Sequence, residues 1–124
     1  MAAMLEHFPD VPVVAEEQAA AGVVPVTDDD FFLVDPLDGT KEFISKNGDF
    51  TVNIALIYKG SPILGVIYVP VHDTTYMGTA ILGTYVTRNN ETKKITVRNK
   101  NKGLIAVGSK SHSSEADQKV LAQY

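Results

Sequence analysis

The feature that most constrains the fold is an apolar run that stops abruptly on two aspartates. Residues 31 to 34, Phe-Phe-Leu-Val, are all apolar, and Asp-Pro-Leu-Asp-Gly-Thr follows at residues 35 to 40. A short, wholly apolar run of this kind is typical of a strand that is covered on both faces. Pro36 has no backbone donor and holds the preceding residue in extended geometry, so we expect the strand to end at Asp35.

The residues after this strand indicate a metal and phosphate site. Asp35 and Asp38 lie three apart across the expected turn, so their carboxylates can converge. Gly39 permits a positive φ. Residues 40 to 47 predict a short helix, and its first amide groups suit an anion. A left-handed stop is expected at Asn47-Gly48. Hard oxygen ligands beside such a helix point to a divalent ion of the magnesium kind. A simpler alternative stays open, because Asp-Pro and Asp-Gly are common in turns and aspartate commonly caps helices.

The remaining chain predicts an antiparallel meander. Residues 13 and 14 form a short expected strand, and two long β-rich runs at residues 51 to 58 and 63 to 71 are separated by a Lys-Gly-Ser-Pro turn. Shorter strands are expected at residues 74 to 80, 84 to 88, 93 to 97 and 104 to 108. The pattern therefore predicts one α+β domain over residues 1 to 124, a mostly antiparallel sheet with flanking helices.

Helices are expected near both ends of this domain. One ends before Pro9, and another runs from about residue 115 to 124, where Ser114 and Asp117 have the spacing of a capping box. Residues 18 to 30 combine small residues with an acidic run and predict a loosely ordered connector.

Composition excludes several classes of protein. Fifteen acidic and eleven basic residues give a formal net charge of −4, which disfavours a general nucleic-acid-binding surface. The absence of cysteine excludes disulfides, thiolate metal sites and cysteine nucleophiles. No window approaches the roughly 18 apolar residues of a transmembrane helix, and the amino end lacks the features of a signal peptide. We expect a cytoplasmic protein.

Residues 33 to 43, Leu-Val-Asp-Pro-Leu-Asp-Gly-Thr-Lys-Glu-Phe, resemble the hallmark segment of the inositol monophosphatase superfamily. The Lys-Glu-Phe extension resembles its 3'(2'),5'-bisphosphate nucleotidase branch, and the similarity continues through residues 47 to 57 and 63 to 71. The resemblance implies part of the layered αβαβα sugar-phosphatase fold. It also implies a magnesium-dependent phosphomonoesterase of sulfur metabolism that converts adenosine 3',5'-bisphosphate to AMP and phosphate. An inositol monophosphatase-like phosphatase is the sibling alternative.

The same resemblance implies a set of metal ligands. Glu16 and Glu17 follow the strand expected at residues 13 and 14, and on their own they would most simply be solvated. They resemble the Glu-Glu element of the superfamily, whose first glutamate binds metal, a role implied for Glu16. Two magnesium ions are implied, one held by Glu16, Asp35 and the Leu37 carbonyl and one shared by Asp35 and Asp38.

Catalytic and substrate contacts are implied as well. Glu16, Asp38 and Thr40 would act in catalysis, with Glu16 and Thr40 orienting the attacking water. Amide groups at Gly39 and Thr40 would hold the phosphate. His112 lies in a Ser-Lys-Ser-His-Ser-Ser run that resembles the nucleotide-holding segment of the branch. The implied substrate contacts are therefore Glu16, Leu37, Asp38, Gly39, Thr40 and His112.

The resemblance covers the central part of the superfamily pattern. These 124 residues contain neither the amino-terminal Thr-x-x-Asp helix element nor the carboxyl-terminal Trp-Asp segment, which supplies a further metal ligand, and they contain no tryptophan. A second class of function therefore stays open, a catalytically incomplete fragment or a non-catalytic metal-binding or interaction module. A sheet left exposed in such a fragment favours a homodimer.

Overall fold

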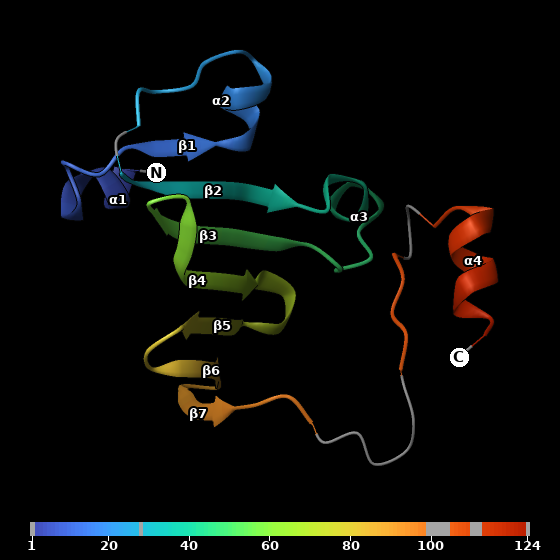
Figure 1. Ribbon diagram of the computed structural model, residues 1–124. Helices are drawn as coiled ribbons and strands as arrows, with labels where there is room; N and C mark the ends of the chain where they lie inside the picture. The colour runs from blue at the N-terminus through green and yellow to red at the C-terminus, as the bar shows by residue number, and fades with distance from the viewer. Residues whose placement is uncertain (1, 28, 99–104, 110–112, 124) are drawn as a thin grey trace.

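The computed structural model describes residues 2–27, 29–98, 105–109 and 113–123. Its centre is a seven-stranded sheet whose strands lie in sequence order from β1 to β7 (Figure 1). Strand β1 pairs in parallel with β2, and every later neighbouring pair is antiparallel. The predicted α+β class and the mostly antiparallel sheet are confirmed. The elements are α1 (Ala2–His7), β1 (Val13–Ala15), α2 (Glu16–Ala20), β2 (Asp30–Asp38), α3 (Thr40–Ser45), β3 (Thr51–Tyr58), β4 (Ser61–Val69), the 3-10 turn η1 (Pro70–His72), β5 (Thr74–Thr79), β6 (Gly83–Arg88), β7 (Glu91–Ile95) and α4 (Glu115–Leu121).

Two hairpins close through a pair of left-handed residues each. Lys59 and Gly60 take φ values of 49° and 74°, and Asn89 and Asn90 take 51° and 61°. Two consecutive left-handed residues close a hairpin with the twist that antiparallel strands require. Strands β4 and β7 therefore begin two residues earlier than expected, at residues 61 and 91.

Strand β2 runs past the proline that was expected to end it. It continues to Asp38, and its pairing with β3 shifts in register between Asp35 and Asp38. Because a residue at such an irregularity need not donate to the neighbouring strand, Pro36 is accommodated inside the strand. The prediction that β2 ends at Asp35 is wrong. Because the strand continues, Asp35 and Asp38 both lie on β2.

The core lies where β1 and β2 meet. The apolar side chains buried among the described residues are Val14, Ala15, Phe32 and Val34. The ring of Phe8, just after α1, packs 5.3 Å from the Phe32 ring between centroids. Leu33, between two buried neighbours, is 45% exposed, so β2 is covered on one face and not on both as predicted. The first turns of the chain supply the cover for that face.

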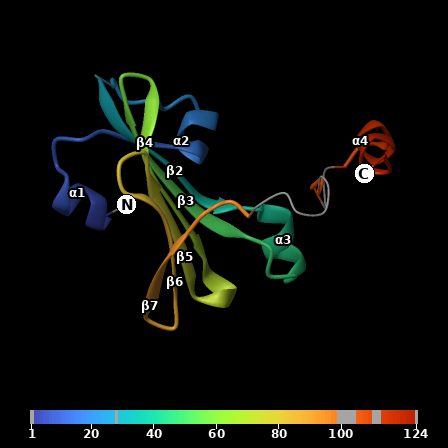
Figure 2. The same ribbon diagram turned by 60° about the horizontal axis from the view of Figure 1, so that its bottom comes forward.

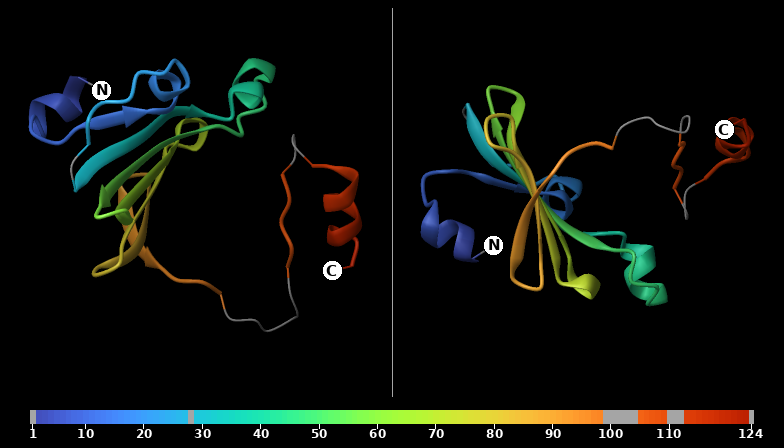
Figure 3. Two further views of the ribbon diagram at one scale, coloured as in Figure 1. Left: turned by 45° about the horizontal axis from the view of Figure 1, so that its top comes forward. Right: turned by 90° about the horizontal axis from the view of Figure 1, so that it is seen from below.

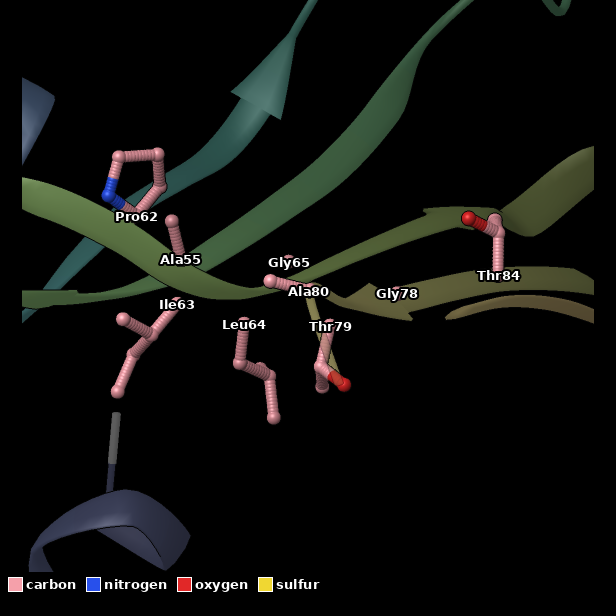
Figure 4. A pocket seen from close by; sticks show the side chains of 9 residues that line it. All are labelled: Ala55, Pro62, Ile63, Leu64, Gly65, Gly78, Thr79, Ala80 and Thr84. Carbon is pink, nitrogen blue, oxygen red and sulfur yellow. The ribbon is translucent and has the colours of Figure 1, made fainter. Parts of the chain in front are cut away.

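A hollow lies on the part of the sheet formed by β3, β4 and β5 (Figure 4). Gly65 and Gly78 face each other across β4 and β5, and a Cβ added at Gly65 would meet no atom within 4 Å. None of the residues that line the hollow carries an ionisable side chain: they are Ala55, Pro62, Ile63, Leu64, Gly65, Gly78, Thr79, Ala80 and Thr84. The hollow therefore adds no acid, base or charged ligand to the molecule.

The carboxyl-terminal segment lies away from the sheet (Figures 1 and 2). Residues 105 to 108 form no strand in the described structure, contrary to the prediction, and residue 104 lies outside the described residues. Helix α4 packs locally, with Leu121 Cδ1 only 2.6 Å from a Cβ placed on Gly108. The predicted capping box is confirmed at its start.

Helices α1 and α3 lie near opposite ends of the sheet (Figure 3). The short helix α2 occupies the first residues of what was predicted to be a loose connector. Among the described residues, no helix combines the length and the apolar character needed to cross a membrane.

Candidate metal-binding site

The parallel pairing of β1 and β2 brings the predicted acidic residues to one edge of the sheet. Ala15, the last residue of β1, pairs with Val34 of β2. The next residue of each strand is acidic, Glu16 at the start of α2 and Asp35 on β2. Because the two strands run the same way, their carboxyl ends lie side by side (Figure 1). The strand pairing thus joins residues that are far apart in sequence.

The carboxyl groups at this edge act strongly on one another. The Glu16 side chain is hydrogen-bonded to Asp35, and this bond is the largest cause of a Glu16 pKa raised above its ordinary value. The negative charge of Asp35, some loss of hydration, and the charges of Asp38 and Glu17 raise the pKa of Glu16 further. A hydrogen bond between two carboxyl groups needs a proton on one of them, so the contact with Asp35 favours the protonated form of Glu16 and raises its pKa.

Asp38 is held by a side chain of the neighbouring strand. The Asn53 Nδ2 group donates a 2.8 Å hydrogen bond to Asp38 Oδ2. Asn53 stands opposite Asp35 in the β2–β3 pairing, and the register shift that follows brings Asp38 within its reach. The Asn53 Oδ1 atom is buried and has no hydrogen-bond partner.

The segment from Asp35 to the start of α3 is held by local hydrogen bonds between side chains and backbone. The Leu37 backbone N–H donates to Asp35 Oδ1 at 3.1 Å, and the Thr40 hydroxyl donates to the Leu37 carbonyl at 3.3 Å. Gly39 has a φ of 93°, and a Cβ there would lie 2.9 Å from the Asp49 carbonyl oxygen. Only glycine fits this position without strain, because both the left-handed φ and the close backbone contact exclude a side chain.

Helix α3 leads away from the site and packs on the start of β3. The Phe43 and Phe50 rings meet edge to face with centroids 5.1 Å apart. The helix ends at Lys46, whose φ of 56° is left-handed. The left-handed stop predicted at Asn47-Gly48 therefore comes earlier, because the amides of Lys46 and Asn47 already satisfy the carbonyls of Phe43 and Glu42.

The structure places the predicted residues as follows. Glu16, Asp35 and Asp38 lie together, with Leu37, Gly39 and Thr40 in the adjoining turn, and His112 lies outside the described residues. Within the part of the chain that the structure describes, no three His, Asp or Glu side chains stand in an arrangement that could hold a metal ion. The carboxyl groups are close to one another, and they are engaged by the Glu16–Asp35 hydrogen bond and by the Asn53 amide.

Asn53 is a site residue that was not predicted from the sequence. Its signal was present, since it is the single amide inside an otherwise apolar run, Val-Asn-Ile-Ala-Leu-Ile, at residues 52 to 57. What the sequence could not supply was the strand register that sets this amide opposite Asp35.

Fold and site together define a class, a mostly antiparallel α+β protein with an acidic site at the carboxyl edge of adjacent strands. The model of the inositol monophosphatase family matches residues 1–124. The chain belongs to the inositol monophosphatase family.

The chain is similar to known members of the nucleotidase branch. It is 44% identical over 115 residues to a 3'(2'),5'-bisphosphate nucleotidase CysQ of Salmonella typhimurium, covering 93% of this chain and 46% of that protein. The crystal structure of CysQ from Bacteroides thetaiotaomicron aligns with a TM-score of 0.77 at 34% identity, over 98% of this chain and 50% of the other. An inositol monophosphatase from Anabaena aligns with a TM-score of 0.67 at 34% identity, over 77% and 36% of the two chains. The chain thus spans about half the length of the curated relatives it matches.

Proposed function

We propose that this chain carries the metal-binding portion of a magnesium-dependent phosphomonoesterase, a 3'(2'),5'-bisphosphate nucleotidase. Its proposed substrate is adenosine 3',5'-bisphosphate, which it would convert to AMP and phosphate. The observation that carries the proposal is the cluster of Glu16, Asp35 and Asp38, in which the hydrogen bond to Asp35 and then the neighbouring negative charges raise the pKa of Glu16. The similarity to CysQ proteins over 93% of the chain supports this choice of substrate.

The donor set fits a hard divalent cation in its chemistry. All three side chains offer carboxylate oxygens, and Leu37 adds a carbonyl in the adjoining turn, as magnesium prefers. The charges that raise the Glu16 pKa all belong to other carboxylates. A bound divalent cation would offset the repulsion between these carboxylates, so the cluster is expected to destabilise the folded chain least when a cation is bound.

The proposed ligands follow from this placement. Glu16, Asp35 and the Leu37 carbonyl would hold one magnesium ion, and Asp35 and Asp38 would share a second. Uncatalysed phosphate-monoester hydrolysis is so slow that enzymes supply accelerations of up to about 10²¹-fold, and bound magnesium supplies charge neutralisation and an acidified water.

The turn residues have proposed roles of their own. Thr40 donates its hydroxyl proton to the Leu37 carbonyl, which fixes the hydroxyl oxygen with its lone pairs free to accept from the attacking water. Glu16 would orient the same water, and the Gly39 and Thr40 amides would hold the phosphate. His112 is proposed to contact the nucleotide. The cytoplasmic location also stays a proposal.

A second candidate is a catalytically incomplete module that acts through its sheet. Leu33 and Ile67 are 45% and 46% exposed and lie on the same face as Asp35 and Asn53. Apolar surface of this kind favours a covering partner, and a homodimer is the proposed one. An inositol phosphate as substrate is the remaining alternative within the family.

Phosphate release separates these candidates. The chain and its Asp38→Ala variant are incubated with adenosine 3',5'-bisphosphate or with inositol monophosphate, each with and without Mg²⁺, and their mass in solution is measured. Mg²⁺-dependent release from the nucleotide that is lost in the variant supports the nucleotidase. Faster release from inositol monophosphate would favour the sibling activity. A folded chain that binds Mg²⁺ and releases no phosphate would favour the incomplete module.

A further inference from the structure

We propose that Asn53 is a positioning residue, which holds the Asp38 carboxylate in the orientation that cation binding requires. The inference rests on the proposed function and deepens it. Asn53 is set opposite Asp35 by the strand register, and its Nδ2 group reaches Asp38 Oδ2 at 2.8 Å. One amide on β3 therefore contacts one aspartate of the site and stands across from the other.

An amide is suited to this task because it is a neutral donor. A lysine or arginine at the same place would orient Asp38 but would also cancel the charge that attracts a cation. The Asn53 amide fixes one carboxylate oxygen and leaves the charge in place, so Asp38 Oδ1 stays available. Hydrogen bonds to ligating carboxylates commonly set ligand geometry in metal sites.

The orientation of the amide is fixed by the same contact. If the Asn53 side chain were turned over, its Oδ1 atom would face the Asp38 carboxylate, and two acceptors would repel. Nδ2 therefore faces Asp38, and Oδ1 is left buried without a partner. A buried acceptor without a donor is costly, and such groups in native proteins usually have a cause.

The contact with Asp38 is that cause. It holds Nδ2 toward the carboxylate and leaves Oδ1 buried without a donor. The amide therefore gives up one hydrogen bond of its own while it orients the Asp38 side chain.

The test measures Mg²⁺ affinity by calorimetry in the full 124-residue chain. Asn53→Leu keeps the size of the side chain and removes the donor and the acceptor. Thr92→Val is the matched control, since it removes a cross-strand side-chain hydrogen bond of 2.9 Å to Thr87, between β6 and β7. We expect Asn53→Leu to weaken Mg²⁺ binding by about 10- to 100-fold at an unchanged unfolding temperature, and Thr92→Val to leave binding unchanged.

A second measurement follows the contact itself without metal. In the metal-free chain, the Asn53 side-chain amide resonances should shift in Asp38→Ala and stay in place in Thr92→Val. Mg²⁺ affinity in Asn53→Leu equal to that of the unsubstituted chain would overturn the role of Asn53 and leave the proposed function standing. Absence of Mg²⁺ binding by the unsubstituted chain would remove the proposed metal site and this inference with it.

Discussion

The surroundings of Asp117 and Glu16 shift the pKa values of these two acids in opposite directions. Asp117, at the start of α4, accepts hydrogen bonds from the Ser114 hydroxyl at 2.7 Å and the Ser114 backbone N–H at 2.8 Å. These bonds, the hydroxyl first, lower the pKa of Asp117. At the ends of β1 and β2, the hydrogen bond to Asp35 and the surrounding negative charges raise the pKa of Glu16.

The contrast separates an acid that serves the fold from acids that serve a ligand. Asp117 is satisfied by donors of its own chain, so ionisation stabilises the helix start. Glu16, Asp35 and Asp38 repel one another, so ionisation destabilises the folded chain unless a cation is present. An acidic cluster that costs stability in the metal-free chain is what a binding site, rather than a structural feature, is expected to show.

We expect Glu16→Gln to have the strongest effect: it should stabilise the chain without Mg²⁺ and make it less stable than the unsubstituted chain when Mg²⁺ is present. Without Mg²⁺ the substitution removes repulsion and should raise the unfolding temperature. With Mg²⁺ at about 1,000 times its dissociation constant, the ion held by Glu16 should stabilise the unsubstituted chain by about 4.1 kcal/mol, and the variant should lack this contribution. Thermal unfolding of both chains over a Mg²⁺ series measures this. Equal Mg²⁺ stabilisation of the two chains would contradict a ligand role for Glu16.

A smaller effect is expected from the backbone turn that carries Asp38. Gly39→Ala forces a Cβ to within 2.9 Å of the Asp49 carbonyl oxygen, whereas Gly60→Ala, also at a positive φ, meets no atom within 4 Å. Both variants carry left-handed strain, so their difference isolates the close contact. We expect Gly39→Ala to be about 1–3 kcal/mol less stable than Gly60→Ala by chemical denaturation, and it alone should lose Mg²⁺ binding.

If Gly39→Ala and Gly60→Ala were equally stable and bound Mg²⁺ equally well, the turn would tolerate a side chain. The close packing of Gly39 on residue 49 would then have no bearing on the site. Circular dichroism spectra of both variants serve as the control that each one is folded.

The capping box should give a still smaller and purely local effect. Ser114→Ala removes the side-chain oxygen that accepts from the Asp117 N–H at 3.2 Å. Loss of a serine cap typically costs about 1 kcal/mol of helix stability. We expect faster amide exchange within α4 (Glu115–Leu121), with unchanged exchange in the sheet and unchanged Mg²⁺ affinity. A change in Mg²⁺ affinity would show that the two acidic regions are coupled.

The parts of the structure that depend on neighbouring residues were predictable from the sequence. The capping box at Ser114 and Asp117 follows from local backbone chemistry, and the structure confirms it. The hairpin expected between residues 58 and 63 is also present, although its turn is shorter than predicted. Short turns between consecutive strands make those strands antiparallel neighbours, so the turn positions determine the meander. The predicted order of strands from β2 to β7 is therefore correct, with ends that differ by a few residues.

The parts that depend on distant partners were not predictable. The end of β2 was placed too early because the register shift opposite β3 accommodates Pro36. The prediction that both faces of β2 are covered was wrong because the face that carries Leu33 is left partly exposed. The predicted strand at residues 104 to 108 has no neighbouring strand to pair with in the described structure. Asn53 was missed for the same reason, since only strand pairing sets it beside the aspartates. The roles given to the site residues stay predictions.

The finest test of the comparison is the pH dependence of the two acids, followed by carboxyl NMR. The lowered pKa of Asp117 means that its contribution is present above its ordinary pKa and is lost as pH falls through the lowered value. In the metal-free chain, the raised pKa of Glu16 means that the unfolded chain loses its proton first. Stability should therefore fall as pH rises from the ordinary pKa to the raised one.

Magnesium should affect only one of these two titrations. A bound cation favours the ionised form of its ligands, so Mg²⁺ should move the Glu16 titration to lower pH and release protons. Asp117 is hydrogen-bonded by Ser114 at the start of α4 and should titrate alike with and without the ion. Movement of both resonances would mean that Mg²⁺ acts on the chain as a whole. Movement of neither would mean that the cluster at the end of β1 and β2 does not bind the cation, and its raised pKa would then reflect crowding alone.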